Sequence, residues 1–134
     1  MAGDELALAS AGEQAAAIAN KQISSRELLD LFLTRVDQLD EPVHAVVTLD
    51  AERARAAATA ADEATARDER SGPLHGLPIT IKDAIETEGI RSTGGAVELK
   101  DHVPSADAPA VARLKAAGAI VFGKTNLPRW SGDL

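Results

Sequence analysis

Lys82 is the residue whose type and position suggest chemistry. It directly follows the apolar segment LPITI (residues 77–81), which has the length of a short buried strand. Because side chains alternate along a strand, Leu77, Ile79 and Ile81 should share one face and Lys82 should point to the other. Open α/β sheets bind ligands beyond the carboxyl ends of their strands. An amine held in such a poorly solvated place can lose its proton and act as a base.

A surface ion pair with the neighbouring Asp83 is the simpler interpretation of Lys82. Such pairs are common at strand ends and contribute little to stability. Asp83 can also orient Lys82 or cap the segment that follows, and capping is the role we expect. Spacing alone therefore favours the ion pair over the base.

No nucleophile accompanies this base in a recognisable arrangement. None of the serines has a lysine three positions later, and the chain lacks a G-x-S-x-G elbow. The polar segment Ser92-Thr93-Gly94-Gly95 could approach a ligand, but a plain turn is expected. The histidines are scattered at positions 44, 75 and 102, so each is expected to be structural and no metal site is predicted.

Residues 118–125, GAIVFGKT, match the spacing of a phosphate-binding loop. Such a loop needs a strand before its first glycine and a bare backbone between the glycines. Here a helical segment precedes Gly118, and bulky strand-forming residues separate the glycines. Pro128 disfavours a helix starting at Lys124. We therefore interpret the segment as the end of a helix followed by a buried strand.

Helices are expected through most of the first seventy residues. Apolar residues near helical spacing predict an amphipathic segment that ends near Lys21. Ser24 and Glu27 have the spacing of a capping box for a second helix, which Pro42 should stop. Its predicted apolar face consists of Leu28, Leu29, Phe32, Val36 and Leu39.

Strands and helices then alternate along the chain. A strand is predicted over residues 43–49, and Asp50 is the expected cap of an alanine-rich helix over residues 51–70. After the turn residues 71–73 comes the strand that precedes Lys82. Asp107 and Pro109 should start another helix, which ends at Gly118 before a strand over residues 119–123. This order predicts an α/β fold with crossover connections.

Composition limits the classes of function. The chain has 134 residues, 45% of them hydrophobic and 26% charged, which is typical of a soluble globular protein. A net charge of −7 argues against binding nucleic acid or an anionic membrane surface. No apolar run is long enough to span a bilayer, and the first residues do not form a secretory signal. The absence of cysteine excludes thiol chemistry and is compatible with the cytoplasm.

The segment GPLHGLPITIKD (residues 72–83) resembles the start of the amidase signature family. The resemblance continues through Thr93-Gly94-Gly95 and DAPAVARLKAAGAIVFGKTN (residues 107–126). It also reaches back to ISSRELLDLFLTRVDQLD (residues 23–40) and to HAVV (residues 44–47). It implies that GKTN closes a strand and leads into a loop on the substrate side, with no nucleotide. The fold it implies is the N-terminal part of an α/β/α sandwich with a mixed sheet.

The same resemblance implies hydrolysis of a carboxylic amide by a Ser–cis-Ser–Lys triad. Lys82 matches the lysine of that triad, and it would accept a proton from a bridging serine that activates a nucleophilic serine. The segment from Thr125 to Ser131 resembles the one whose backbone lines the acyl pocket, so Ser131 is a candidate backbone contact to substrate. Neither a cofactor nor a metal is implied.

Both triad serines of the family lie beyond GKTN, outside this sequence. We therefore expect residues 1–134 to be the N-terminal fragment of a single amidase signature domain, inactive alone. Residues 1–70 would be mainly helical, and residues 71–134 would carry strands, loops and the catalytic lysine. The expected partners are a small-molecule amide and the remainder of the amidase chain, with a homodimer possible. Alternatives are the glutaminase-type A subunit of a tRNA-dependent amidotransferase and a non-enzymatic helical binding module.

Overall fold

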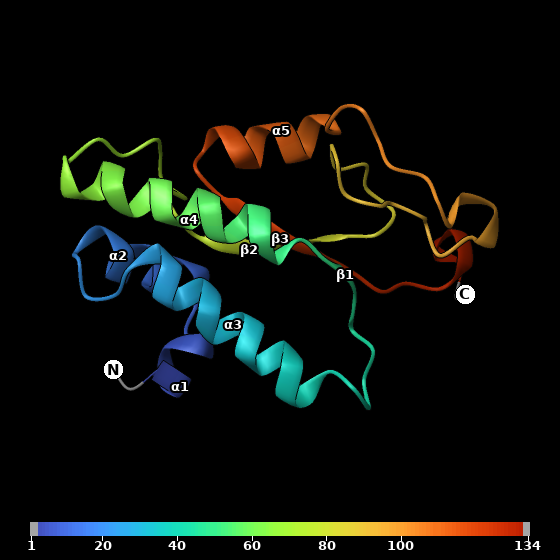
Figure 1. The fold of residues 1–134 in the computed structure, drawn as a ribbon, viewed down its shortest axis with the longest axis horizontal. Helices are drawn as coiled ribbons and strands as arrows, with labels where there is room; N and C mark the ends of the chain where they lie inside the picture. Colours follow the sequence, from blue (N-terminus) through green and yellow to red (C-terminus); the bar gives the residue numbers. More distant parts are fainter. Residues whose placement is uncertain (1–2, 133–134) are drawn as a thin grey trace.

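The computed structural model describes residues 3–132, which fold into helices around a small sheet (Figure 1). Two single 3₁₀ turns, η1 (Val97–Leu99) and η2 (Arg129–Ser131), lie in the loops. The helices and strands are, in chain order, α1 (Gly3–Ala7), α2 (Ala11–Ala19), α3 (Ser25–Leu39), β1 (Val46–Leu49), α4 (Ala51–Ala66), β2 (Pro78–Lys82), α5 (Pro109–Ala116) and β3 (Ile120–Thr125).

The sheet is mixed, with strand order β1-β3-β2. Strand β3 pairs parallel with β2 and antiparallel with β1. The connection from β2 to β3 passes through α5, as parallel neighbours require. The predicted α/β fold with a mixed sheet is therefore confirmed.

Apolar clusters lie on both faces of the sheet. On one face, Leu29 of α3 and Ala58 of α4 are fully buried and cluster with Ile120 and Phe122 of β3. The small Ala58 side chain lets α4 lie close to α3 (Figure 1). On the other face, Val111 of α5 packs with residues that include Ile81 and Val121. The sheet is thus covered by helices on both sides.

Helices α2 and α3 both begin at capping boxes. In the predicted box, the Glu27 backbone N–H donates to Ser24 Oγ (3.0 Å) and the Ser24 N–H donates to Glu27 Oε2 (2.9 Å). The amphipathic segment predicted before it is two helices, because Ser10 breaks the run and caps α2 with Glu13 in the same way.

Several details differ from the sequence predictions, including the end of α4 at Ala66 instead of residue 70 and the bounds of β3 at Ile120–Thr125 instead of residues 119–123. The strand predicted from residue 43 starts at Val46, because His44 adopts a left-handed conformation (φ 51°) that interrupts an extended chain. Leu39, predicted on the apolar face of α3, is 53% exposed at the end of that helix. Asp50 occupies the N-cap position of α4 without a side-chain cap, and its carboxylate instead accepts from Arg53 Nε (2.6 Å).

The segment that matches a phosphate-binding spacing is a helix end and a strand, as interpreted from the sequence. Gly118 follows α5 with φ 99°, and a Cβ at this position would lie 2.6 Å from the His75 Cα. The residues after it form the buried strand β3. The backbone between the two glycines is therefore engaged in the sheet and is not free to wrap a phosphate.

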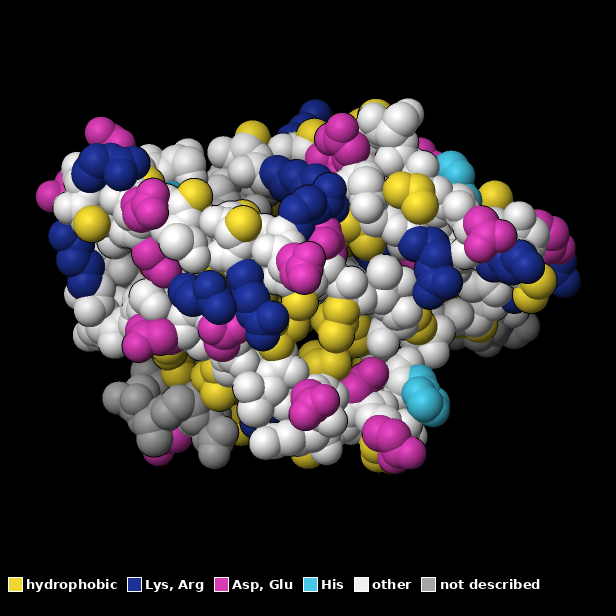
Figure 2. Space-filling model, viewed as in Figure 1, with side chains coloured by type: hydrophobic (Ala, Val, Ile, Leu, Met, Phe, Trp, Pro, Cys, Tyr) yellow, Lys and Arg dark blue, Asp and Glu magenta, His cyan; other side chains and the backbone are white. Residues whose placement is uncertain are grey.

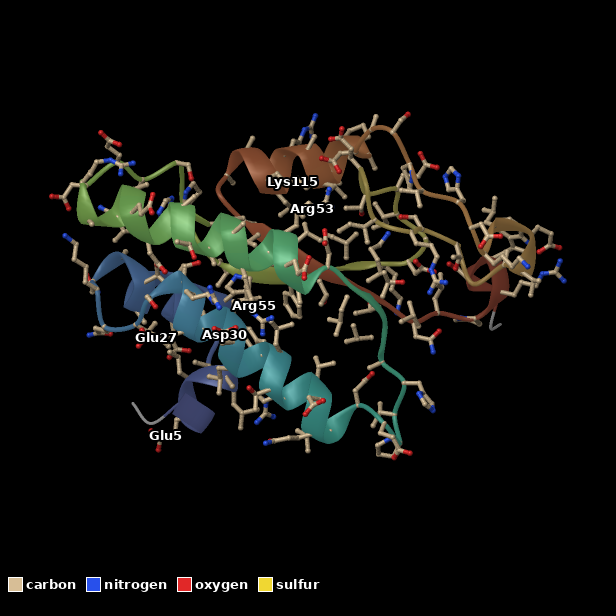
Figure 3. All side chains as sticks on the ribbon, viewed as in Figure 1. Glu5, Glu27, Asp30, Arg53, Arg55 and Lys115 are labelled. Atoms are coloured by element: carbon tan, nitrogen blue, oxygen red, sulfur yellow. The ribbon has the colours of Figure 1, made fainter. Side chains whose placement is uncertain are left out.

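Charges of both signs are interspersed on the surface in Figure 2, around apolar atoms in a hollow near the centre of the view. Figure 3 shows one mixed group between α3 and α4, where Asp30 lies below Arg55. The Asp30 carboxylate accepts from Arg55 Nε (2.9 Å) and Arg26 Nε (2.7 Å). Both bonds lower the pKa of the Asp30 carboxyl, and the bond from Arg55 has the larger effect. Among the described residues, no helix is both long and apolar enough to cross a membrane.

Candidate active site

Lys82 lies at the carboxyl end of β2, opposite Thr125 of the parallel strand β3. The two strands therefore end at the same edge of the sheet, where α/β folds place ligand sites. The Lys82 Nζ donates to the backbone carbonyl of Asn126 (2.5 Å), the residue that follows β3. This bond directs the amine across the edge of the strand pair.

The lysine side chain is exposed in the part of the chain that the structure describes. The poorly solvated environment expected from its strand-end position is therefore not formed by residues 3–132. The physical reason is that Lys82 points away from the apolar cluster that buries its neighbour Ile81. The alternative of an ion pair with Asp83 is also not observed within these residues, since the Lys82 amine bonds to a carbonyl.

Asp83 is buried, with 3% of its surface exposed. Its N–H donates to the Thr125 carbonyl (3.0 Å), and its own carbonyl accepts from the Gly94 N–H (3.0 Å). Oδ2 of the carboxylate accepts from the Thr93 N–H (3.2 Å) and from the Thr93 hydroxyl. Asp83 thus caps the turn at residues 92–95, ten positions later, in agreement with the capping role expected for it. Its buried Oδ1 has no hydrogen-bond partner among the described residues.

Lys124 is the residue of this region that the sequence interpretation missed. Its exposed fraction is 0%, and its Nζ donates to the Ile85 carbonyl (2.7 Å) and to Ser92 Oγ (2.6 Å). Burial lowers the pKa of the Lys124 amine, and the negative charges of Asp83 and Glu86 oppose that effect. A lysine within the apolar run that forms β3 was the available signal, because burying a charge needs specific partners.

A β-bulge explains why Lys124 points into this loop. Ile79 pairs with Val121, but the next residue of β2, Thr80, pairs with Gly123, so Phe122 is an extra residue in β3. Beyond the bulge, Ile81 lies opposite Lys124. Directly paired residues share a face of a sheet, so the bulge puts Lys124 on the Ile81 face.

A pocket of about 160 Å³ lies between the loop after β2 and the turn η2. It is lined by polar groups that include Asp83, Glu86, Ser92, His102 and Ser131, with Trp130 beside them. Ser131, the candidate backbone contact to substrate, is exposed and adopts φ 57° next to Trp130 at φ 53°. Left-handed conformations in consecutive non-glycine residues are costly and often mark functional segments.

A larger pocket, of about 900 Å³, lies elsewhere, among α1, α2 and α3. Its lining includes Leu6, Ile23 and Leu31, and neither Lys82 nor Lys124 lines this pocket or the smaller one. The smaller pocket is the better candidate for chemistry, because it adjoins Asp83 and the segment that follows β3.

Two of the histidines considered from the sequence have side-chain hydrogen-bond partners. Buried His75 lies with Nε2 3.0 Å from Thr65 Oγ1, and His102 Nε2 lies 2.7 Å from Glu86. The described residues contain no cluster of three or more groups able to bind a metal. Ser92 bonds to Lys124, and among the described residues Lys82 Nζ bonds to the Asn126 carbonyl and to no serine hydroxyl. Residues 3–132 therefore present a lysine at a strand end without a nucleophile.

Comparisons with known proteins identify families and solved structures that are similar to this chain. The profile of the amidase family matches residues 27–132. The A subunit of glutamyl-tRNA(Gln) amidotransferase from Anaeromyxobacter sp. (strain K) is 42% identical over 89% of this chain. The chain is also similar to the solved peptide amidase of Stenotrophomonas maltophilia (32% identity, 90% of this chain, TM-score 0.84). A bacterial aryl acylamidase of the amidase signature family matches 91% of the chain (29% identity, TM-score 0.83). The chain spans about a quarter of each relative, 24%, 25% and 26% respectively.

Proposed function

The chain belongs to the amidase family, and we propose from this that the protein hydrolyses a carboxylic amide through a Ser–cis-Ser–Lys triad in which Lys82 is the lysine. The observation that carries the proposal is the position of Lys82 at the shared carboxyl edge of β2 and β3, bonded to the Asn126 carbonyl. Both serines would belong to the remainder of the amidase domain, of which residues 1–134 would be the N-terminal part.

The proposed chemistry is a relay of protons toward Lys82. The neutral amine accepts a proton from the bridging serine, which accepts one from the nucleophilic serine as that oxygen attacks the amide carbonyl. The proton then passes to the leaving nitrogen, and water releases the acyl group as a carboxylic acid. Backbone N–H groups near the nucleophile would stabilise the negative oxygen.

The bond from Lys82 to Asn126 suits this role. A neutral amine has two N–H groups and one lone pair. Donating one N–H to the carbonyl, at 2.5 Å, fixes the direction of the remaining positions. The lone pair is then free to face the bridging serine.

Replacing Lys82 by alanine in the full-length protein tests the proposal. We expect loss of turnover on amides and an unchanged fold, because the side chain is exposed and packs in none of the apolar clusters. Lys100→Ala, at an exposed lysine in the turn after η1, is the matched control and should leave kcat unchanged. A Lys82→Ala enzyme that kept near-normal kcat would remove Lys82 from the mechanism.

Ser131 is proposed as a contact to substrate through its backbone. The position of this residue beside the 160 Å³ pocket supports the proposal. Because the side chain takes no part, Ser131→Ala should leave kcat and KM unchanged in steady-state assays. A large loss of kcat in this variant would assign a role to the hydroxyl and contradict the backbone contact.

A second candidate function is that of an amidotransferase A subunit, which would liberate ammonia from glutamine for a tRNA-linked acceptor. The 42% identity to a protein of that name supports it. Assaying the purified full-length protein, without other subunits, on simple amides and on glutamine separates the two functions. Efficient hydrolysis of simple amides favours the hydrolase. Activity that requires added partner subunits favours the amidotransferase.

The 134-residue chain alone is proposed to be inactive, since no described serine contacts Lys82. Labelling of this chain by an active-site-directed serine reagent would contradict that. A non-enzymatic binding module is the remaining alternative, and the amidase family match over most of the chain argues against it.

A further inference from the structure

We propose that Lys124 is a positioning residue for the Lys82 site, holding the loop that follows β2 so that Lys82 and Asp83 keep their places at the strand edge. This inference rests on the proposed function of Lys82. It concerns a second lysine that never meets the substrate, since Lys124 is completely buried.

The first step is the geometry of the bonds made by the Lys124 ammonium. Its Nζ donates to Ile85, two residues after Asp83, and to Ser92, two residues before Gly94. One cation therefore joins the outgoing and returning ends of the same loop. The Ser92 hydroxyl passes the connection on by donating to the Ile90 carbonyl (3.0 Å).

The second step is the backbone of Asp83. Its N–H bonds to the Thr125 carbonyl on β3, and its carbonyl bonds to the Gly94 N–H on the returning end of the loop. Gly94 can reach this position only while the two ends of the loop stay together. The Lys124 bonds thus support the backbone of the residue next to Lys82.

The third step is charge. Asp83 is buried with one carboxylate oxygen unpaired, and the attraction between Asp83 and Lys124 opposes the effect of burial on the lysine. Asp83 and Lys124 form no direct ion pair, but removing the ammonium takes this attraction away from a buried carboxylate, which favours local rearrangement. The loop next to Lys82 is where such a rearrangement would occur.

Lys124→Met in the full-length enzyme tests this role, because it removes the ammonium and keeps most of the apolar stem. Active-site titration with a serine-directed reagent counts competent sites, so that kcat is expressed per competent site. We expect kcat per site to fall by about 10- to 100-fold with KM changed by less than about twofold, as for displaced catalytic groups. Lys100→Met, at the exposed lysine after η1, should keep wild-type values.

A kcat per competent site within about twofold of wild type, or a loss confined to KM, would overturn the inference. A purely structural role would lower the melting temperature or the number of competent sites but leave kcat per site unchanged. If Lys124→Met does not fold, Ser92→Ala decides instead, because it removes only one acceptor of the ammonium. We expect a smaller fall in kcat per site for that variant, and an unchanged kcat would again overturn the inference.

The outcome is separable from failure of the proposed function. If Lys82→Ala remains active, the assignment of Lys82 is wrong and Lys124 has nothing to position. If Lys82→Ala is inactive while Lys124→Met is normal, only the positioning role is wrong. Asp83→Asn combined with Lys124→Met removes both charges, and it should recover part of the kcat lost in Lys124→Met if the uncompensated carboxylate causes the loss.

Discussion

Lys82 and Lys124 extend from the carboxyl edge of one parallel strand pair onto opposite faces of the sheet. Lys124 is paired with Ile81, and Lys82 is the next residue of β2, so alternation separates the two side chains. One amine is exposed and bonds to a backbone carbonyl beyond β3. The other is buried and bonds inside the loop after β2. The strand pair thus carries an accessible lysine beside an inaccessible one, which suits a reactive group and its support.

Gly118→Ala should destabilise the protein by more than about 1 kcal/mol. The glycine has φ 99°, and an added Cβ would lie 2.6 Å from the His75 Cα. Neither the backbone conformation nor the space accommodates alanine. Urea denaturation of the wild type and the variant measures the difference.

The matched control for this prediction is Gly12→Ala, in the exposed first turn of α2. There the nearest atom to an added Cβ is Ser10 Oγ at 4.0 Å, so the change is accommodated. It should stabilise the protein by up to about 1 kcal/mol, because glycine is unfavourable in a helix. Equal effects from the two variants would contradict the conflict expected between an added Cβ at position 118 and His75.

Ser24→Ala should destabilise the protein by about 1 kcal/mol, because it removes the hydroxyl that caps α3. The Ser24 N–H and hydroxyl lower the pKa of Glu27. A carboxylate whose folded-state pKa is lowered contributes stability above its unfolded value of 4.5, and this is lost as pH falls through the folded value. Part of the difference between wild type and variant should therefore disappear in acid.

Thermal melts at neutral and acidic pH check this prediction. Ser105→Ala, at an exposed serine outside the helices, serves as the control and should have no effect at either pH. A Ser24→Ala difference that stayed constant down to the lowest pH at which the protein folds would contradict the contribution of Glu27.

The features predicted correctly from sequence are those that depend on nearby residues. The Ser24–Glu27 capping box spans three residues, and the strand before Lys82 follows from a run of five. The family resemblance extends this to the fold, because it links residues 72–83 with residues 107–126.

The features missed depend on contacts between distant residues. The partners of Lys124 lie 39 and 32 positions earlier in the chain, and a bulge at Phe122 decides which face the lysine occupies. Neither contact leaves a periodic signal in the sequence. The exposure of Lys82 was also missed, because strand position predicts the edge of the sheet but not what covers it.

Asp62→Ala should destabilise the protein by about 1–2 kcal/mol, although the residue lies on α4 and the helix it caps is α3. Its carboxylate accepts from the backbone N–H groups of Ser25 (2.7 Å) and Arg26 (3.0 Å), which have no partner within their own helix. The side chain thereby joins the two helices. Chemical denaturation of wild type and variant measures the effect.

Two further variants separate the parts of this interaction. Asp62→Asn keeps one carbonyl acceptor and removes the charge. Its free energy of unfolding should therefore lie between those of the wild type and Asp62→Ala. Glu63→Ala changes the neighbouring acid and should have little effect, because Glu63 is exposed and the N–H groups of Ser25 and Arg26 bond to Asp62. Equal costs for Asp62→Ala and Glu63→Ala would show that the cap contributes nothing specific.

The stability contributed by Lys124 should depend on pH in the alkaline range. Burial lowers the pKa of this amine below the ordinary value of 10.5, so between the folded and unfolded values the unfolded chain binds more protons. Stability from this site therefore rises with pH in that window and is lowest below the pKa of the folded state.

The free energy of unfolding of the wild type should therefore increase relative to that of Lys124→Met as pH rises from neutral toward 10.5. Urea denaturation across this range measures it, with Lys100→Met expected to show a constant difference. A constant difference for Lys124→Met as well would mean that the buried amine titrates like an exposed lysine.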